Sequence, residues 1–370
     1  QLFIISLLNI LSFIYVFKEF NFKEFISTFK YKKHFLSFFL VVIVATISLS
    51  FADNFIEGVV SLVKLFNFFI AFCLITIIVL KPNFNMYYYF IVATIASLLI
   101  ESVIINYLVV ESVIINGNLL GRSNSYAGFG ANINISSFSV LIKSIVPIYL
   151  LFNYKNVLIK LISYFLLVSS FLTVLLLMSR AAIIALFLVF ISIFFLSIIA
   201  NKKKYYFTNA LLISTLIISM LSYNIINEKN AYNILGERFS NVTNPVVDGS
   251  VNERLNFYTT AIGSIIENTL LGIGYGNWKI KSIDLSKEII ISYRVPYFVH
   301  NDFLQITAEI GIFGGLCYMF YILFPFWVSF KKTIKHRLFN IDFMIFLIFL
   351  IYIVDSMLNF PIERPINLIY

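Results

Sequence analysis

The sequence predicts an all-α polytopic membrane protein, and three observations support this fold class. Apolar residues make up 60% of the 370 residues and charged residues only 12%, a composition typical of chains that fold in lipid. Apolar runs of about 20 residues, the length that a helix needs to cross a bilayer, recur along the chain. Basic residues gather in alternate loops, as in multi-pass proteins. We expect about ten to eleven transmembrane helices and one long extracytoplasmic loop containing short amphipathic helices.

Ten apolar runs are the candidates for these helices, and one long polar interval follows the eighth. The runs cover residues 2–17, 35–52, 59–80, 86–109, 133–152, 157–178, 181–200, 207–226, 303–328 and 341–359. The prediction is a first part of the transmembrane bundle at 1–226, an extracytoplasmic loop at 227–299 and a second part at 300–370. Because the chain starts at Gln1 and stops at Tyr370 within a new apolar run, we expect a fragment that is truncated at its ends.

Lysine and arginine set the expected orientation, because short cytoplasmic loops are enriched in both. Alternate loops hold Lys18, Lys23, Lys30, Lys32 and Lys33, then Lys81, then Lys155 and Lys160, then Lys202, Lys203 and Lys204, then Lys331, Lys332, Lys335 and Arg337. The short opposite loops near 53–58 and 110–132 hold only Arg122. Arg122, Arg180, the 227–299 loop and His300 are therefore expected on the extracytoplasmic side.

Several functional classes are disfavoured. The net charge of +9 does not indicate a nucleic-acid partner, because loop positions account for the basic residues. Cys73 and Cys317 lie inside apolar runs and are expected to be small core residues rather than a disulfide or metal pair. The sequence contains no D-x-D pair, H-E-x-x-H motif, P-loop or Cys/His metal spacing. The repeat of Glu101–Asn106 as Glu111–Asn116 is interpreted as a local duplication that lengthens a helix end, without a function.

Arg180 opens an apolar run with no other charge for about 20 residues on either side. An arginine at the bilayer centre costs about 2.5–3.5 kcal/mol on insertion scales, whereas near an interface its chain can snorkel to water. A snorkelling anchor is the structural alternative to a functional arginine. The position of Arg180 opposite the basic loops favours function.

Arg254 lies in a predicted amphipathic helix of the long loop. Ser250–Glu253 has the S-x-x-E form of a capping box, and Leu255, Tyr258, Ile262, Ile265 and Ile266 follow at helical spacing. A plain surface helix with an exposed Arg254 is the alternative. Gly272, Gly274 and Gly276 lack the strand and helix of a dinucleotide fingerprint, and they predict a close-packed turn near a ligand or a helix.

His300 is predicted at the mouth of an apolar helix. Asp302 and Gln305 have the spacing of a cap and its N3 partner, and the dipole at a helix N-terminus favours a neutral imidazole suited to general base work. Asp302, Gln305 and Glu309 share one helix face, which is expected to face the bundle interior. A capping histidine with a structural carboxylate is the alternative. Close helix packing is the expected reason for Gly311 and Gly315.

A fourth polar element is the loop Gly121–Asn134, which carries Arg122 and enters a helix. The three arginines Arg122, Arg180 and Arg254 are expected to converge with His300 on one membrane face. Arginine recognises phosphate through paired hydrogen bonds. The site therefore suits a lipid-linked phosphate or pyrophosphate, whose charge the arginines would neutralise in place of a metal.

These segments resemble the O-antigen ligase and O-antigen polymerase superfamily of bacterial envelope glycosyltransferases. The resemblance covers roughly residues 115–365 and rests on Ser179-Arg180, on Arg254 followed by Gly272–Gly276, on His300–Gln305 with Glu309–Gly311, and on Asp355–Pro361. It implies that a glycan is transferred from undecaprenyl pyrophosphate to a hydroxyl of lipid A-core, of another lipid-linked glycan or of a protein. The implied location is the periplasmic face of the bacterial inner membrane, and no metal or nucleotide cofactor is implied.

The resemblance maps the functional residues of the family onto this chain. His300, Arg180 and Arg254 are the expected catalytic residues, and Arg122, Arg180 and Arg254 are expected to bind the pyrophosphate and stabilise it as it leaves. Asn301, Asp302, Gln305 and Glu309 are the expected supporting residues, with Asp302 or Glu309 positioning His300 or an arginine. His300 would orient or deprotonate the acceptor hydroxyl, and in-line displacement would invert the anomeric centre.

Two other functional classes are possible from the sequence. A transporter or flippase for an anionic or lipid-linked solute could also use arginines, but such proteins often show inverted repeats and broken helices at mid-membrane. The sequence shows no pair of Gly/Pro-interrupted spans in corresponding positions. A non-catalytic envelope-assembly protein is the third class. Ligase and polymerase activities are both compatible with the site.

Overall fold

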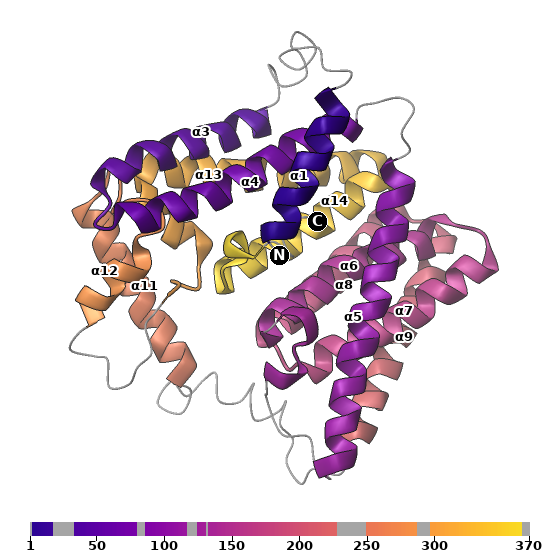
Figure 1. Cartoon of the computed structure of the whole chain (residues 1–370). Coiled ribbons are helices and arrows are strands. Elements are labelled where there is room, and N and C mark those ends of the chain that lie inside the picture. Colours follow the sequence, from indigo (N-terminus) through magenta and orange to yellow (C-terminus); the bar gives the residue numbers. More distant parts are fainter. Residues whose placement is uncertain are drawn as a thin grey trace. The chain divides into compact units, whose positions relative to one another are not determined.

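The computed structural model describes residues 2–17, 33–79, 86–116, 124–130, 132–227, 249–286 and 297–364, and these residues contain helices and no strand (Figure 1). The helices are α1 (Leu2–Phe17), α3 (Lys33–Ser48), α4 (Phe55–Val79), α5 (Met86–Asn116), α6 (Ile133–Asn153), α7 (Val157–Leu176), α8 (Arg180–Ala200), α9 (Lys203–Asn227), α11 (Gly249–Glu267), α12 (Trp278–Ser286), α13 (Asp302–His336) and α14 (Ile341–Leu358). Short 3₁₀ turns include η1 (Leu49–Phe51) and η5 (Pro361–Glu363). The all-α class is confirmed.

Nine helices within the described ranges are long and apolar enough to cross a membrane. They are α3 (continued by η1), α4, α5, α6, α7, α8, α9, α13 and α14. Each corresponds to one of the predicted apolar runs. The remaining run, 2–17, forms α1, an apolar helix of only 16 residues. The chain is therefore a polytopic membrane protein.

The described helices group into two compact units. The first unit comprises Gln1–Tyr87, Gly249–Pro325 and Ser356–Leu368, and it includes α1, α3, α4, α11, α12 and most of α13. The second unit comprises Tyr88–Asp248, Phe326–Asp355 and Ile369–Tyr370, and it includes α6, α7, α8, α9 and most of α5 and α14. His300 and Arg254 belong to the first unit, and Arg180 belongs to the second.

Helix α6 forms the core of the second unit and carries a charge that the span prediction overlooked. Within the helix, 94% of its most apolar window is buried. Lys143 lies in this window and forms an ion pair with Glu101 of α5. Ser139, one turn away from Lys143, donates a hydrogen bond to the same Glu101 oxygen at 3.0 Å. An ion pair inside a bundle satisfies two charges that lipid would not tolerate.

The duplicated segment lies within α5, which continues to Asn116 and includes both copies. The first copy contacts neighbouring helices through its polar side chains. Glu101 pairs with Lys143, and the side chain of Asn106 accepts a hydrogen bond from Thr173 at 2.9 Å. Glu111 in the second copy accepts a bond from Tyr107, one turn earlier on the same helix. The second copy thus lengthens the helix, as predicted, while the first holds α5 to α6 and α7.

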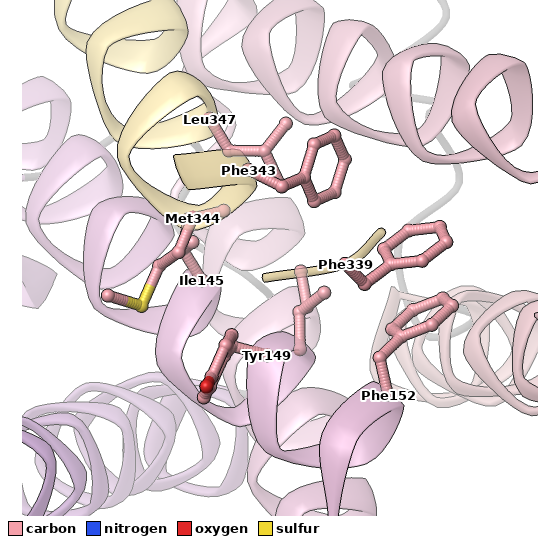
Figure 2. Close-up of a pocket in the computed structure, with 8 residues that line it drawn as sticks. Ile145, Tyr149, Phe152, Phe339, Phe343, Met344 and Leu347 are labelled. Carbon is pink, nitrogen blue, oxygen red and sulfur yellow. The ribbon is translucent and has the colours of Figure 1, made fainter. Parts of the chain in front are cut away.

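An apolar pocket lies between α6 and the turn that joins α13 to α14 (Figure 2). Phe343, Met344 and Leu347 of α14 line it together with Ile145, Ile148, Tyr149 and Phe152 of α6 and with Phe339. The rings of Phe339 and Phe152 stack with centroids 3.9 Å apart. No charged side chain lines the pocket, so we interpret it as a packing seam rather than a site for an anionic substrate.

In the first unit, α13 is interrupted at Gly311, whose backbone is non-helical with φ 75° and ψ 175°. Residues 268–277, here called the glycine turn, fill the interruption. Ile273 donates its N–H to the Ala308 carbonyl at 3.0 Å, and Ile312 donates its N–H to the Thr269 carbonyl at 2.9 Å. In a continuous helix, the Ile312 N–H would instead donate to the Ala308 carbonyl. Irregular backbone is tolerated at membrane depth only where such partners exist.

The prediction for Gly311 was therefore incomplete, because backbone conformation and not helix packing alone requires glycine there. A Cβ atom on Gly311 would meet the Leu270 carbonyl, and one on Gly272 would meet the backbone of Glu309. Gly272, Gly274 and Gly276 all have positive φ, a conformation that glycine adopts without strain. The predicted close-packed turn near a helix is confirmed.

Candidate functional site

Glu309 holds the glycine turn against α13. Its two carboxylate oxygens accept backbone N–H bonds from Gly276 at 3.0 Å and from Trp278 at 3.2 Å. Trp278 is the first residue of α12, so the carboxylate also complements the positive end of that helix. Glu309 is buried, and its contacts match the structural alternative stated above. We assign Glu309 as the anchor of the turn.

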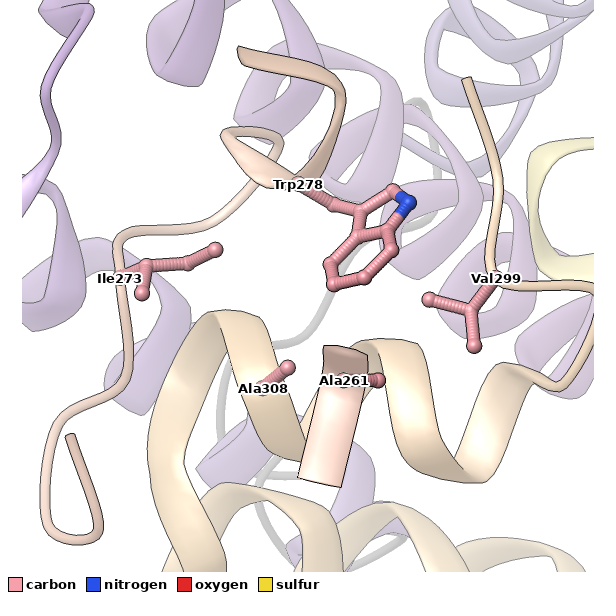
Figure 3. Close-up of a cluster of buried hydrophobic side chains, with 5 residues drawn as sticks. All are labelled: Ala261, Ile273, Trp278, Val299 and Ala308. Carbon is pink, nitrogen blue, oxygen red and sulfur yellow. The ribbon is translucent and has the colours of Figure 1, made fainter. Parts of the chain in front are cut away.

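Trp278 is the centre of a buried cluster that fixes α11 beside α13 (Figure 3). Ala261 of α11, Ile273 of the glycine turn, Val299 and Ala308 surround its indole ring, which is 1% exposed. Tyr258 and Ile265 of α11 pack against this cluster. Leu255, Ile262 and Ile266 form a second stripe on α11 and are exposed. The amphipathic helix therefore lies against the bundle and presents a further apolar stripe outward.

The start of α13 differs from the prediction by one residue. Asn301, not Asp302, caps the helix, because its side-chain oxygen accepts the N–H of Leu304 at 3.1 Å. Gln305 reaches back to accept the N–H of Val299 at 3.1 Å. Asp302 already belongs to the helix, and its side chain turns inward. Asp302, Gln305 and Glu309 are all buried, which agrees with the prediction that this helix face points to the interior.

Asp302 connects the N-terminus of α13 to η5. Its Oδ2 atom accepts the N–H of Ile362 at 3.0 Å and the hydroxyl of Tyr318 at 3.3 Å. The turn held in this way carries Phe360, whose ring lies edge-on to the imidazole of His300 with centroids 5.0 Å apart. Asp302 is thus linked to His300 through the turn that carries Phe360.

His300 occupies a constrained position between α11 and the turn after α14. Its backbone is left-handed, with φ 61°, which is uncommon for a residue other than glycine. The Tyr258 hydroxyl donates to the His300 carbonyl at 3.2 Å, and the ring of Phe257 lies parallel to the imidazole at 6.4 Å. The buried Nδ1 atom has no hydrogen-bond partner in the part of the chain that the structure describes. Two phenyl rings therefore frame the imidazole.

The surroundings of His300 keep the imidazole neutral. Burial, the largest cause, and the positive charges of Arg254 and Arg364 together lower the pKa of His300 to about 4. The predicted neutral form agrees with this pKa, although burial and two cations are its causes rather than the helix dipole alone. Burial also raises the pKa of Tyr258, while the charge of Arg254 opposes that rise.

Arg364 is a cation beside His300 that the sequence did not point out. Its guanidinium lies over the Phe360 ring, 4.5 Å from the centroid, and 5.7 Å from the centroid of Phe298. These two rings stack on each other with centroids 4.0 Å apart. The only feature of the sequence that could have indicated Arg364 is that it follows the Asp355–Pro361 motif closely.

Arg180 is the first residue of α8 in the second unit. The preceding Ser179 donates a hydrogen bond to the Asn134 side chain at 3.0 Å, so the start of α8 lies beside the start of α6. Asn134 ends the polar loop that was predicted to contribute Arg122. Arg122 itself lies outside the described residues. Of the predicted set, the structure brings Arg254 and His300 together.

Comparison with protein families adds an independent observation. Residues 165–319 match the family model described as O-antigen ligase. The chain is therefore similar to the O-antigen ligase family over this region, which is less than half of its length. This match confirms the resemblance that the motifs indicated, and it implies transfer of a glycan of the O-antigen ligase or polymerase type. No curated protein matches the chain at a significant level.

The region that matches the O-antigen ligase model begins within α7 and ends within α13. It therefore includes Arg180, Arg254, His300 and the Glu309 anchor. Arg364 and η5 lie beyond its C-terminal boundary. The imidazole thus lies inside the matched region, whereas one of the two cations that act on it comes from outside.

Proposed function

We propose that this protein transfers a glycan from undecaprenyl pyrophosphate to an acceptor hydroxyl on the extracytoplasmic face of a bacterial inner membrane. The match to the O-antigen ligase model supports glycan transfer in general. The observation that carries the specific proposal is the environment of His300. A neutral imidazole lies there just before the start of α13, and the charges of Arg254 and Arg364 both act on it.

The arginines bind the donor in this proposal. A pyrophosphate carries several negative charges, and guanidinium groups neutralise them with directed hydrogen bonds. Arg254 binds it beside His300, and the binding roles expected for Arg122 and Arg180 from the sequence stay predictions. The main effect of the arginines is on the transition state, because negative charge accumulates on the pyrophosphate as it leaves.

His300 activates the acceptor. The acceptor hydroxyl oxygen forms a bond to the anomeric carbon of the glycan while the hydroxyl proton passes to the imidazole. The bond between the anomeric carbon and the pyrophosphate oxygen breaks, and its electron pair leaves with undecaprenyl pyrophosphate. His300 then releases the proton to solvent. Attack opposite the leaving group inverts the anomeric configuration.

The supporting residues position this centre. Asn301, the residue that follows His300, caps α13 and is fixed by that hydrogen bond. Asp302 holds η5 through Ile362, and Gln305 holds Val299 just before His300. Glu309 keeps the glycine turn in the interruption of α13. These residues act through backbone geometry rather than by touching the substrate.

The interruption of α13 at Gly311 is the one observation that favours the transporter alternative, because transporters bind solutes at broken helices. In this chain, however, backbone groups of the glycine turn bond the Ala308 carbonyl and the Ile312 N–H at the break. Those groups are therefore occupied by the protein itself. The break serves to seat the glycine turn.

Reconstitution in proteoliposomes tests the proposal against this alternative. Purified protein would be given an undecaprenyl-pyrophosphate-linked glycan together with lipid A-core, a second lipid-linked glycan or a serine-containing peptide. We expect a new glycosidic linkage to one of these acceptors, with the opposite anomeric configuration. Movement of the labelled donor between leaflets without any new linkage would contradict the proposal and support a flippase.

A further inference from the structure

Arg364 is close to His300 although 64 positions separate them in the sequence. The two side chains share one neighbour, the ring of Phe360. The imidazole approaches that ring edge-on with centroids 5.0 Å apart, and the guanidinium lies over it at 4.5 Å. The ring is held in turn by stacking on Phe298. A cation over a phenyl ring is attracted by the negative charge of the ring face.

The backbone that carries Arg364 is held by two hydrogen bonds. Its N–H donates to the Pro361 carbonyl at 2.8 Å, and the neighbouring Ile362 donates to the buried Asp302. Asp302 directly follows the Asn301 cap of α13. The same helix start therefore fixes the position of His300 and that of Arg364, and this link does not require either side chain to touch the other.

We propose that Arg364 binds the pyrophosphate of the donor together with Arg254, and that donor binding there switches His300 from an inactive to an active base. This inference rests on the proposed function and extends it, because it couples activation of the acceptor to occupation of the donor site. Arg254 contributes from α11 and Arg364 from the turn after α14, so a pyrophosphate between them would contact two separate elements.

The coupling follows from the charges around His300. The charges that act on its imidazole are those of Arg254 from α11 and Arg364 from the residue after η5. Of the other ionisable groups on the packed elements, Tyr258 bonds to the His300 carbonyl, Asp302 bonds to Ile362, and Glu363 interacts with Arg364. Without a donor, burial and the two arginines disfavour the imidazolium. A bound pyrophosphate offsets both positive charges. The basicity of His300 then rises toward the range in which a general base is effective near neutral pH.

A purely structural role is the alternative for Arg364. In that case its contacts with Phe298 and Phe360, and the nearby charge of Glu363, would serve only to hold the turn. The two roles predict different effects of charge. A structural arginine can be replaced by methionine with little effect on donor affinity or on the change in His300 titration that donor binding causes, provided that the turn remains folded.

The experiment measures binding and titration separately from transfer. Binding of undecaprenyl pyrophosphate to purified protein in nanodiscs would be compared for the wild type, R364K and R364M, with R337M as the control at an exposed arginine beyond α13. We expect R364M to weaken binding by about tenfold to a hundredfold, the loss of one charge-assisted contact. R364K keeps the charge but loses the paired geometry, so its loss should be smaller. R337M should bind as the wild type does.

Nuclear magnetic resonance of labelled histidine provides the second measurement, because the chain has only three histidines. Without ligand, the pKa of His300 should be higher in R364M than in the wild type and unchanged in R364K. Addition of undecaprenyl pyrophosphate should raise it in the wild type and raise it less in R364M. Wild-type affinity and an unshifted His300 titration in a folded R364M variant would overturn the inference. Absence of transfer by the wild type, with these binding effects intact, would instead contradict the proposed function.

Discussion

The Lys143 ammonium lies 2.5 Å from the Glu101 carboxylate, and both side chains are 3% exposed. The pair joins α5 to α6 inside the second unit, and Ser139 donates a further hydrogen bond to the same carboxylate oxygen. Two buried charges compensate each other there, and removal of either one would leave the other without its counterion. The pair therefore links α5 to α6 through buried charges.

Removing one partner of this pair should destabilise the protein strongly. We expect E101Q and K143M each to lower the free energy of unfolding by about 3–5 kcal/mol, the usual cost of an unpaired buried charge. The double variant E101L/K143M should recover much of that loss, because no charge remains. Thermal melting in detergent measures the effect, with K155M at an exposed lysine as the control. Single variants as stable as the wild type would show that the pair is not buried in the folded protein.

The Glu309 carboxylate should be required to seat the glycine turn. In E309Q the side-chain amide would face the N–H donor of Gly276 or Trp278, and one donor would lose its acceptor. We expect a loss of about 1–3 kcal/mol in unfolding free energy and a red shift of Trp278 emission, since the indole would become more exposed. The shift is measurable in a W327F background, because Trp327 is the only other tryptophan. Unchanged emission and stability would contradict the anchoring role.

Glycine positions offer a matched test of the interruption in α13. Gly311 has φ 75° and ψ 175°, a region that only glycine populates freely, so G311A should cost about 1–3 kcal/mol in addition to the clash with Leu270. Gly263 lies within α11 with open space around its Cα. G263A should be neutral or stabilise by up to about 1 kcal/mol through helix propensity. Equal melting temperatures for the two variants would argue for a continuous α13.

His300 should make stability depend on pH. Its pKa falls from 6.5 to about 4 on folding, so the unfolded chain binds more protons between these values. Unfolding free energy should therefore be highest above pH 6.5 and decrease as the pH falls toward 4. The difference between the wild type and H300Q isolates this contribution from that of the carboxylates. A pH dependence that H300Q leaves unchanged would show that His300 is not buried beside cations.

Most of the fold could be predicted because lipid imposes a simple rule. Backbone groups must bond within the segment that crosses, so long apolar runs become helices, and nine of the ten predicted runs are described as such. The rule does not detect exceptions inside a run. Lys143 was missed because one lysine hardly changes the mean hydropathy of its apolar run. The interruption at Gly311 was missed because the sequence does not distinguish a glycine that interrupts a helix from a glycine that allows close helix packing.

The site could be predicted only where residues adjacent in sequence determine the chemistry. His300 with its neighbouring cap was identified because a short motif carries it. The choice between Asn301 and Asp302 as the cap was wrong, since both residue types cap well and the distant Ile362 decides which one turns inward. Arg364 was missed for a related reason. Only the folded turn, held by Asp302 and Phe298, brings it to the imidazole.

If His300 takes part in glycan transfer, two histidines near opposite ends of α13 should differ in their importance for activity. H300A and H336A would be reconstituted at matched protein levels and supplied with an undecaprenyl-pyrophosphate-linked glycan and acceptor. His336 ends the helix and is exposed, so H336A should transfer glycan at the wild-type rate, whereas H300A should lose at least about a hundredfold, the range expected for a general base. Wild-type transfer by a folded H300A variant would contradict the account.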